Sequence, residues 1–149
     1  MKEIHERKIM YHMIMALEHD LIEFLYPVLS INDFTNEMLA KIEARNAKAY
    51  SIKEMLEQLG IGDFIEIINK CRGKVELTQN EIDFINKNCG MNIVQIRNRV
   101  MHPKPLMFDD FAVLQNLFNK IDQYIHSIAW LNVIASRDEL EKKFRTCTS

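Results

Sequence analysis

The sequence predicts an all-α protein, a helical bundle with two long helices and shorter helices between them. Apolar residues recur at spacings of three and four over nearly the whole chain, which is the period of a helix with one buried face. The 149 residues include only 4 Gly and 3 Pro, fewer turn residues than a many-stranded β protein needs. A chain of this length can form one hydrophobic core without disulfide bonds or bound metal ions.

The first long helix is predicted from about residue 3 to Tyr26. We expect it to end near Pro27, because proline disrupts a helix interior. Its apolar positions are Ile9, Met13, Leu17, Leu21, Phe24 and Leu25, with Glu6, Glu18 and Glu23 between them. The methionines of this region are expected to fill the core, which is the usual role of methionine at helical spacing.

Shorter helices are predicted next. One runs from Asn36 to about Tyr50. A second begins at Ser51, which stands in capping-box spacing with Glu54, and ends at Gly60. A third helix is capped by Asp63 and reaches about Cys71. A fourth follows the capping box of Thr78 and Glu81 and ends at Gly90. A fifth runs from Met91 to His102, where Pro103 ends it.

The second long helix is predicted from about Asp109 to Ile134, because the apolar period continues without a break. Ser136 and Glu139 form another capping-box pattern, which predicts a short polar helix to about Arg145. We therefore expect one helical domain over residues 1–134 and a short polar tail helix over residues 135–149.

Charge and cysteine content limit the functional classes. Lys plus Arg total 19 and Asp plus Glu 21, a formal net charge of -2, so a duplex-coating DNA-binding protein is not expected. Cys71, Cys89 and Cys147 include no metal-ligand pair, which favours a reducing cytoplasm over disulfides or zinc. The N-terminus is charged and amphipathic, unlike a signal peptide, and no membrane association is expected. The glycines form no phosphate-binding loop, and no cofactor is expected.

One segment combines residue types that suit chemistry on a phosphate. The end of the 91–102 helix carries the run Gln95-Ile96-Arg97-Asn98-Arg99-Val100-Met101-His102-Pro103. An ideal helix separates Arg97 from His102 by about 140°, so the two would not share a face. Proline, however, biases His102 out of the helical region, and Asn98 lies four residues before it, within reach.

These residue types can cut RNA without a metal. The 2′-hydroxyl must lose a proton, the leaving 5′-oxygen must gain one, and the phosphorane charge must be held. A histidine can exchange the protons and an arginine can hold the charge. The plainer interpretation is a surface helix end whose basic side chains complement the helix dipole, and on spacing alone it is favoured.

The string Arg97-Asn98-Arg99-Val100-Met101-His102 resembles the R-x(4-6)-H signature of the HEPN superfamily. Asn98 matches the polar residue that commonly follows the family's arginine. The family's all-α fold, with the motif late and a long helix after it, agrees with the order predicted over about residues 1–134. The resemblance implies a metal-independent endoribonuclease of bacterial defence or stress systems, acting on single-stranded or loop RNA as a homodimer whose two motifs form a composite cleft.

The resemblance also implies roles for individual residues. Arg97 would stabilise the scissile phosphate, His102 would act as general acid or base, and Asn98 would fix the geometry. Arg99 and Lys104 would be auxiliary phosphate contacts. The family's toxin–antitoxin members often carry a tyrosine where this chain has Lys104, a departure that counts against membership of that group. In a dimer, Arg97 of one chain could work with His102 of the other.

Two other functions remain open from the sequence. Some HEPN domains lack activity and serve as RNA-binding or dimerisation modules that regulate an associated nucleotidyltransferase or NTPase. A weaker alternative is a metal or small-ligand site on His12, His19 and Glu23, although His12 and His19 are spaced more widely than usual metal ligands. Trp130 is expected in the core rather than as a base-stacking platform.

Overall fold

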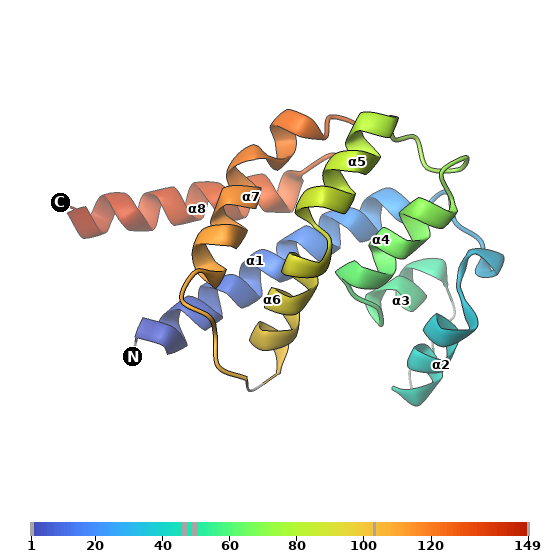
Figure 1. Cartoon of the computed structure of the whole chain (residues 1–149), viewed down its shortest axis with the longest axis horizontal. Helices are drawn as coiled ribbons and strands as arrows, with labels where there is room; N and C mark the ends of the chain where they lie inside the picture. The colour runs from blue at the N-terminus through green and yellow to red at the C-terminus, as the bar shows by residue number, and fades with distance from the viewer. Residues whose placement is uncertain (1, 46–47, 49–50, 103, 149) are drawn as a thin grey trace.

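The computed structural model describes residues 2–45, 48, 51–102 and 104–148, of which the side chains of Lys2 and residues 144–148 are left undescribed. The described residues form helices and connecting segments without a strand, which confirms the predicted all-α bundle (Figure 1). The elements are α1 (Lys2–Leu25), the short 3-10 helix η1 (Ile31–Asp33), α2 (Asn36–Ala44), α3 (Ile52–Glu57), α4 (Ile61–Lys70), α5 (Gln79–Asn88), α6 (Met91–Met101), α7 (Asp110–Tyr124) and α8 (Leu131–Thr148).

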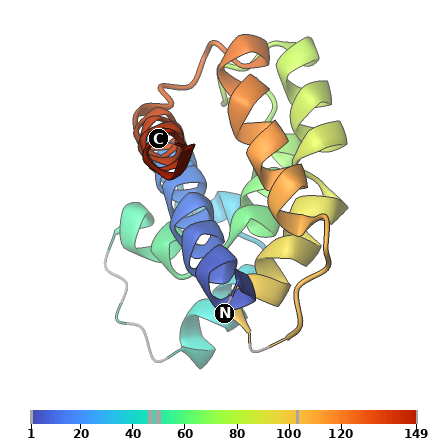
Figure 2. The same cartoon turned by 90° about the vertical axis from the view of Figure 1, so that its left-hand side faces the viewer.

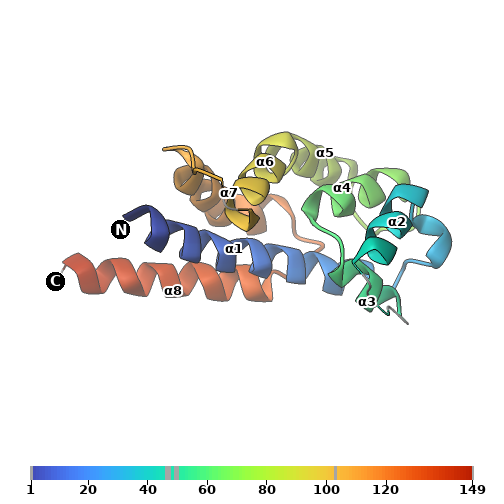
Figure 3. The same cartoon turned by 90° about the horizontal axis from the view of Figure 1, so that it is seen from below.

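The long helix α1 runs through the middle of the molecule. Helix α8 lies beside it and antiparallel to it, so that both termini are at one end (Figures 1 and 3). Helices α4 to α7 lie on the other side of α1, and α2 and α3 lie at the end away from the termini (Figure 3). The view along α1 shows the first turn of this helix next to the segment between α6 and α7 (Figure 2). That segment carries the end of the motif.

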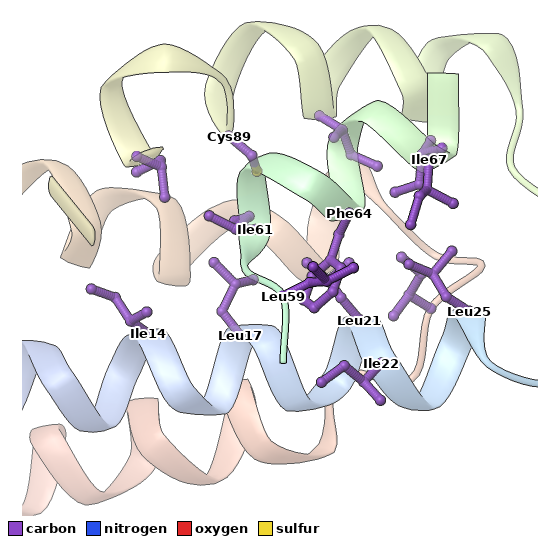
Figure 4. Packing of buried hydrophobic residues seen from close by; sticks show 14 of the residues in the cluster. Ile14, Leu17, Leu21, Ile22, Leu25, Leu59, Ile61, Phe64, Ile67 and Cys89 are labelled. Atoms are coloured by element: carbon purple, nitrogen blue, oxygen red, sulfur yellow. The ribbon is translucent and has the colours of Figure 1, made fainter. Parts of the chain in front are cut away.

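The core extends over the helices from α1 to α8, and one part of it lies where α1 meets α4. Leu17 and Leu21 of α1 point toward Ile61 and Phe64 of α4, and all four side chains are buried (Figure 4). Burying one such side chain contributes about 1.5–3 kcal/mol, so this contact fixes α4, and with it the start of α6, against α1. Trp130 is 4% exposed, as expected for a core residue.

Several predicted boundaries are confirmed. Helix α1 ends at Leu25, two residues before Pro27. Helix α5 begins with the predicted capping box, in which Thr78 Oγ1 accepts from the Glu81 N–H at 3.2 Å and Glu81 Oε1 accepts from the Thr78 N–H at 2.9 Å. Helix α6 begins after Gly90. A Cβ at that position would lie 2.6 Å from the Asn86 carbonyl oxygen, so the close α5–α6 junction requires glycine.

The predicted second long helix, about 109–134, is wrong. Helix α7 ends at Tyr124, and α8 begins at Leu131 and runs to Thr148. The predicted boundary at 134/135 therefore falls inside α8, and residues 135–148 are not a separate tail helix. The Ser136 and Glu139 pattern does not start a helix, because both residues lie within α8.

Buried carboxylates explain this break. Glu81 Oε2 accepts from the N–H groups of His126 at 2.8 Å and Ser127 at 3.0 Å. Asp20 Oδ2 accepts from the N–H groups of Asn132 at 3.1 Å and Val133 at 2.9 Å. These bonds satisfy backbone donors that a continuous helix would have paired internally. The apolar period continues through the break because the connecting residues Ile125 and Ile128 are themselves buried.

Two smaller expectations also need correction. The helix predicted over 36–50 ends at Ala44; residues 46, 47, 49 and 50 lie outside the described part. Asp63 does not begin a helix as its N-cap. Gly60 is the N-cap of α4, and Asp63, three residues on, accepts from the Gly60 N–H at 3.2 Å. Among the described residues, no helix is both long and apolar enough to cross a bilayer.

Candidate functional site

The motif lies on α6 as predicted. Ile93, Ile96 and Val100 face the core, which leaves Asn98 exposed on the opposite side. His102 is the C-cap of α6, with φ −112° and ψ 154°, and its side chain is exposed. This extended backbone is what the following proline favours. The His102 N–H donates to the Asn98 carbonyl at 3.1 Å, a backbone contact rather than the side-chain contact expected from their spacing.

Arg97 is directed toward the middle of α1. Its Nε donates to Glu18 Oε2 at 2.7 Å, and the two side chains are 19% and 7% exposed. Among the described residues, Nε makes the only hydrogen bond of this guanidinium. The Nη1 and Nη2 groups are therefore not fully buried, since no buried side-chain nitrogen lacks a partner. An arginine has five N–H donors, so four remain for a further ligand.

The surroundings of Glu18 explain this orientation. The same Oε2 atom accepts from the Ile61 N–H at 2.7 Å, at the first turn of α4. Gly60 lies directly against the guanidinium, because a Cβ there would be 2.7 Å from Cζ of Arg97. Burial raises the pKa of Glu18, and the charge and hydrogen bond of Arg97 oppose that rise. Glu18 thus joins α1, α4 and α6 at one point.

Arg99 has a different role from the one predicted. Its Nε donates to Asp110 Oδ2 at 2.8 Å and its Nη2 to Asp110 Oδ1 at 2.6 Å. Burial alone would raise the pKa of Asp110, but the hydrogen bonds from Arg99 and the Met107 N–H, together with the charge of Arg99, outweigh it and the pKa is lowered. Asp110 Oδ2 also accepts from the Met107 N–H at 2.9 Å. Arg99 therefore fixes the start of α7 to α6. Its Nε and Nη2 groups are bound to Asp110 and do not face outward as the predicted auxiliary phosphate contact.

The segment around His102 is fixed by the first turns of α1. Arg7 Nη1 donates to the carbonyl of Arg99 at 2.5 Å and to that of His102 at 3.3 Å. Arg7 Nη2 donates to the carbonyl of Lys104. Glu3 Oε1 accepts from the Leu106 N–H at 3.0 Å. A guanidinium at a helix C-terminus satisfies carbonyls that the helix leaves unpaired and complements its dipole.

An open groove of about 570 Å³ adjoins this segment. His102, Lys104, Arg7 and Glu3 line it, together with Ile4, which is 74% exposed. Two further apolar side chains of the α6–α7 segment are exposed, Met107 at 55% and Phe108 at 99%. Large apolar side chains gathered on a surface are typical of contact regions with another molecule. We call Ile4, Met107 and Phe108 the apolar edge.

A single chain does not bring Arg97 and His102 together. Arg97 is held by Glu18, whereas the segment of His102 is held by Arg7. These two α1 residues lie eleven positions apart, about 16 Å along the helix axis. Asn98 and Lys104 are exposed near His102, with no side-chain hydrogen bond to it in the described residues. Within one chain, the contacts of the described residues therefore hold these two side chains in different places.

The alternative metal site is not assembled. His19 and Glu23 approach to 3.9 Å, but His12 lines a groove between α1 and α8, away from the α1–α3 pocket that His19 lines. Among the described side chains, no group of three or more His, Cys, Asp or Glu lies close enough to hold a metal ion. This arrangement gives no support to a site on His12, His19 and Glu23.

Sequence reasoning missed the residues that position the motif. Glu18 was treated as a polar residue beside the apolar stripe, although it lies four positions after Ile14 and three before Leu21, within the stripe. That placement was a usable signal. Arg7 and Asp110 gave no comparable signal, because their contacts join elements far apart in the sequence. Comparisons of the chain with protein-family models, curated proteins and solved structures give no match.

Proposed function

We propose that the chain is a HEPN-type, metal-independent endoribonuclease that cuts single-stranded or loop RNA at a site composed of two chains. The observation that carries the proposal is the orientation of Arg97. The Nε group of Arg97 donates to Glu18, and its two Nη groups remain available to donate to the oxygens of a phosphate. This is the edge through which arginine binds phosphate in a bidentate manner. Bacterial defence or stress response is the setting that the motif resemblance suggests.

The proposed reaction is an internal transesterification. A 2′-hydroxyl loses its proton and attacks the adjacent phosphorus, the bond to the 5′-oxygen breaks, and that oxygen takes up a proton. The products are a 2′,3′-cyclic phosphate and a 5′-hydroxyl. His102 exchanges the proton, and Arg97 holds the charge of the phosphorane. Loops and single strands suit this chemistry, because their nucleotides can be splayed out of the A-form geometry.

The proposal requires self-association, because one chain holds Arg97 and His102 apart. Arg97 of one chain would meet the RNA phosphate together with His102 of the second chain. Ile4 of the apolar edge lines the same groove as His102, and Met107 and Phe108 are exposed on the α6–α7 segment that follows it, so the apolar edge would supply surface for such a contact. Asn98 is exposed on α6 and would orient the RNA, and Lys104 would add a phosphate contact.

Complementation of inactive variants tests the composite site. Purified protein, Arg97→Ala and His102→Ala are each incubated with single-stranded RNA in EDTA, and the two variants are then mixed and allowed to exchange subunits. Each variant alone should be inactive. Random mixing should restore about a quarter of the wild-type activity, because half the dimers are mixed and each has one intact site of two. Equal cleavage by all three proteins would remove these residues from the reaction. If neither the wild type nor the mixture cleaves RNA, the nuclease proposal is wrong.

A second candidate function is a non-catalytic HEPN-type dimerisation or RNA-binding module, regulating an associated nucleotidyltransferase or NTPase. The pairs Arg97–Glu18 and Arg99–Asp110 favour it, because both explain a motif arginine by its role in holding helices together. This candidate predicts a dimer that neither cleaves RNA nor changes its association when His102 is replaced by Asn. Sedimentation of the wild type and His102→Asn, beside the cleavage assay, separates the two functions.

A further inference from the structure

A cationic hollow lies between α5 and α7, away from the motif residues Arg97 and His102. It has a volume of about 110 Å³, and its polar lining consists of Lys87 and Asn88 from α5, Asn92 from α6, and Asn116 and Lys120 from α7. No carboxylate is among its lining residues. A cavity that holds one water needs only about 10–15 Å³ by this measure, so the hollow has room for a group the size of a phosphate.

The two lysines are available for an anion. No ion pair joins Lys87 or Lys120 to a carboxylate among the described residues. The nearest acids along the chain are engaged elsewhere: Asp83 accepts from Gln79 Nε2 at 2.8 Å, and Asp122 accepts from Arg137 Nη1 at 3.0 Å. In a chain of net charge -2, this is a local concentration of unneutralised positive charge.

An aromatic pair continues the same face. The rings of Phe84 on α5 and Tyr124 on α7 are stacked, with centroids 4.8 Å apart and planes 9° from parallel. Lys120 Nζ lies over the ring of Phe84, 6.0 Å from its centroid, so the lysine adjoins the pair. Tyr124 is 56% exposed although one face of its ring covers Phe84. Its other face is therefore open to a further planar group.

We propose that this face, defined by Lys87, Asn88, Asn116, Lys120 and Tyr124, binds a single-stranded nucleic acid. A backbone phosphate enters the hollow between Lys87 and Lys120, the asparagine amides bond to base edges or sugar hydroxyls, and a base stacks on Tyr124. Lys120 and Tyr124 are four residues apart on α7, about 6 Å along its axis, so one nucleotide can contact both. Cations combined with an exposed aromatic ring are the usual components of single-strand binding surfaces. The proposal goes beyond the cleavage reaction, because it uses neither Arg97 nor His102.

The test is binding of a fluorescein-labelled single-stranded RNA of twelve nucleotides, measured by anisotropy over a series of salt concentrations. The 2′-hydroxyls of the RNA are methylated, so that the proposed transesterification cannot cut it. Tyr124→Ala should weaken binding at least fivefold through loss of stacking, while Tyr124→Phe should bind like the wild type. Lys87→Gln combined with Lys120→Gln should weaken binding about tenfold and reduce the slope of log affinity against log salt by about 1.4. The matched control is Lys8→Gln combined with Lys48→Gln, which removes the same charge from exposed positions on α1 and between α2 and α3 and should change affinity less than twofold.

Three results would overturn the proposal. Binding that is unaffected by Tyr124→Ala and competed equally by inorganic polyphosphate would indicate a general anion site. Equal affinity for an RNA duplex would contradict a role for stacking, and tighter binding of a polyglutamate peptide would indicate an acidic protein partner. His102→Asn distinguishes this proposal from the nuclease proposal. It should abolish cleavage, and in that background the α5 and α7 variants should still weaken binding, so the two proposals can fail separately.

Discussion

Glu18 and Arg97 form an ion pair of 2.7 Å between the middle of α1 and the motif helix α6. The same carboxylate oxygen accepts from the Ile61 N–H, so one atom connects three helices. Both side chains are largely shielded from water, which strengthens the interaction but also makes a lone partner costly. The pair therefore sets the position of α6 and the direction in which the Nη groups of Arg97 point.

Replacing Glu18 tests this role. Glu18→Ala should lower the free energy of unfolding by about 2–4 kcal/mol, because it leaves Arg97 and the Ile61 N–H without an acceptor. Glu18→Gln keeps an acceptor oxygen and should cost about half as much. Urea unfolding followed by circular dichroism gives both values. A loss below 0.5 kcal/mol for the alanine variant would show that water replaces the carboxylate and that the pair does not hold α6.

Gly60 should be energetically coupled to the same pair. Gly60 has φ −129° and ψ −178°, a backbone that alanine can adopt, so the cost of Gly60→Ala comes from contact with the Arg97 guanidinium. We expect a loss of about 1–2 kcal/mol in the wild type, as Arg97 is displaced from Glu18. In a Glu18→Ala background Arg97 is free to move, and the same change should be close to neutral. A double-mutant cycle measures this coupling, and strictly additive losses would contradict it.

Much of the fold could be predicted because its signals are local. The apolar stripe of α1, the capping box of Thr78 and Glu81, and the extended backbone of His102 before a proline all depend on neighbouring residues. The break between α7 and α8 could not be predicted, because the carboxylates that bond to its backbone, Glu81 and Asp20, lie on elements distant in the sequence. Periodicity does not detect a break whose connecting residues stay buried.

The candidate site shows the same division. The exposure of His102 and Asn98 follows from which residues of α6 face the core, and periodicity predicts it. The partners of the two arginines, Glu18 and Asp110, lie on other helices. A motif read along the chain therefore identifies chemistry-bearing residues but does not distinguish a guanidinium open to a ligand from one closed on a carboxylate.

The lowered pKa of Glu81 predicts that the free energy of unfolding falls at acid pH. Burial alone would raise the pKa of Glu81, but hydrogen bonds from Thr78, Ser127 and His126 outweigh it and lower the pKa to about 2. A carboxyl with a lowered folded-state pKa stabilises the fold above its unfolded value of 4.5, and this contribution is lost as the pH falls from 4.5 toward 2. The loss should be about 3 kcal/mol, measured by urea unfolding at a series of pH values.

Glu81→Gln isolates this contribution from that of other acids. Asp33, whose pKa is also lowered to about 2 despite burial, titrates in the same range in both proteins and cancels in the comparison. The variant should be less stable than the wild type at pH 7, because an amide cannot accept all four bonds. The difference between the two proteins should shrink as the pH falls from 4.5 to 2. Parallel curves over that interval would exclude Glu81 as the source.

Arg7 should control the order of the segment that carries His102. Its guanidinium donates to backbone carbonyls from Arg99 to Lys104, and a lysine at this position has one nitrogen that cannot reach them all. Arg7→Lys should therefore increase amide hydrogen exchange at His102 and Leu106 about tenfold, with a loss of only about 1 kcal/mol in global stability. The matched control is Lys8→Gln, at the next position on the exposed side of α1. It should change neither the exchange rates at His102 and Leu106 nor the global stability. Exchange that rises equally across α1 and α6 would mean that Arg7 stabilises the whole fold, and unchanged exchange at His102 would mean that the α6 terminus is held without it.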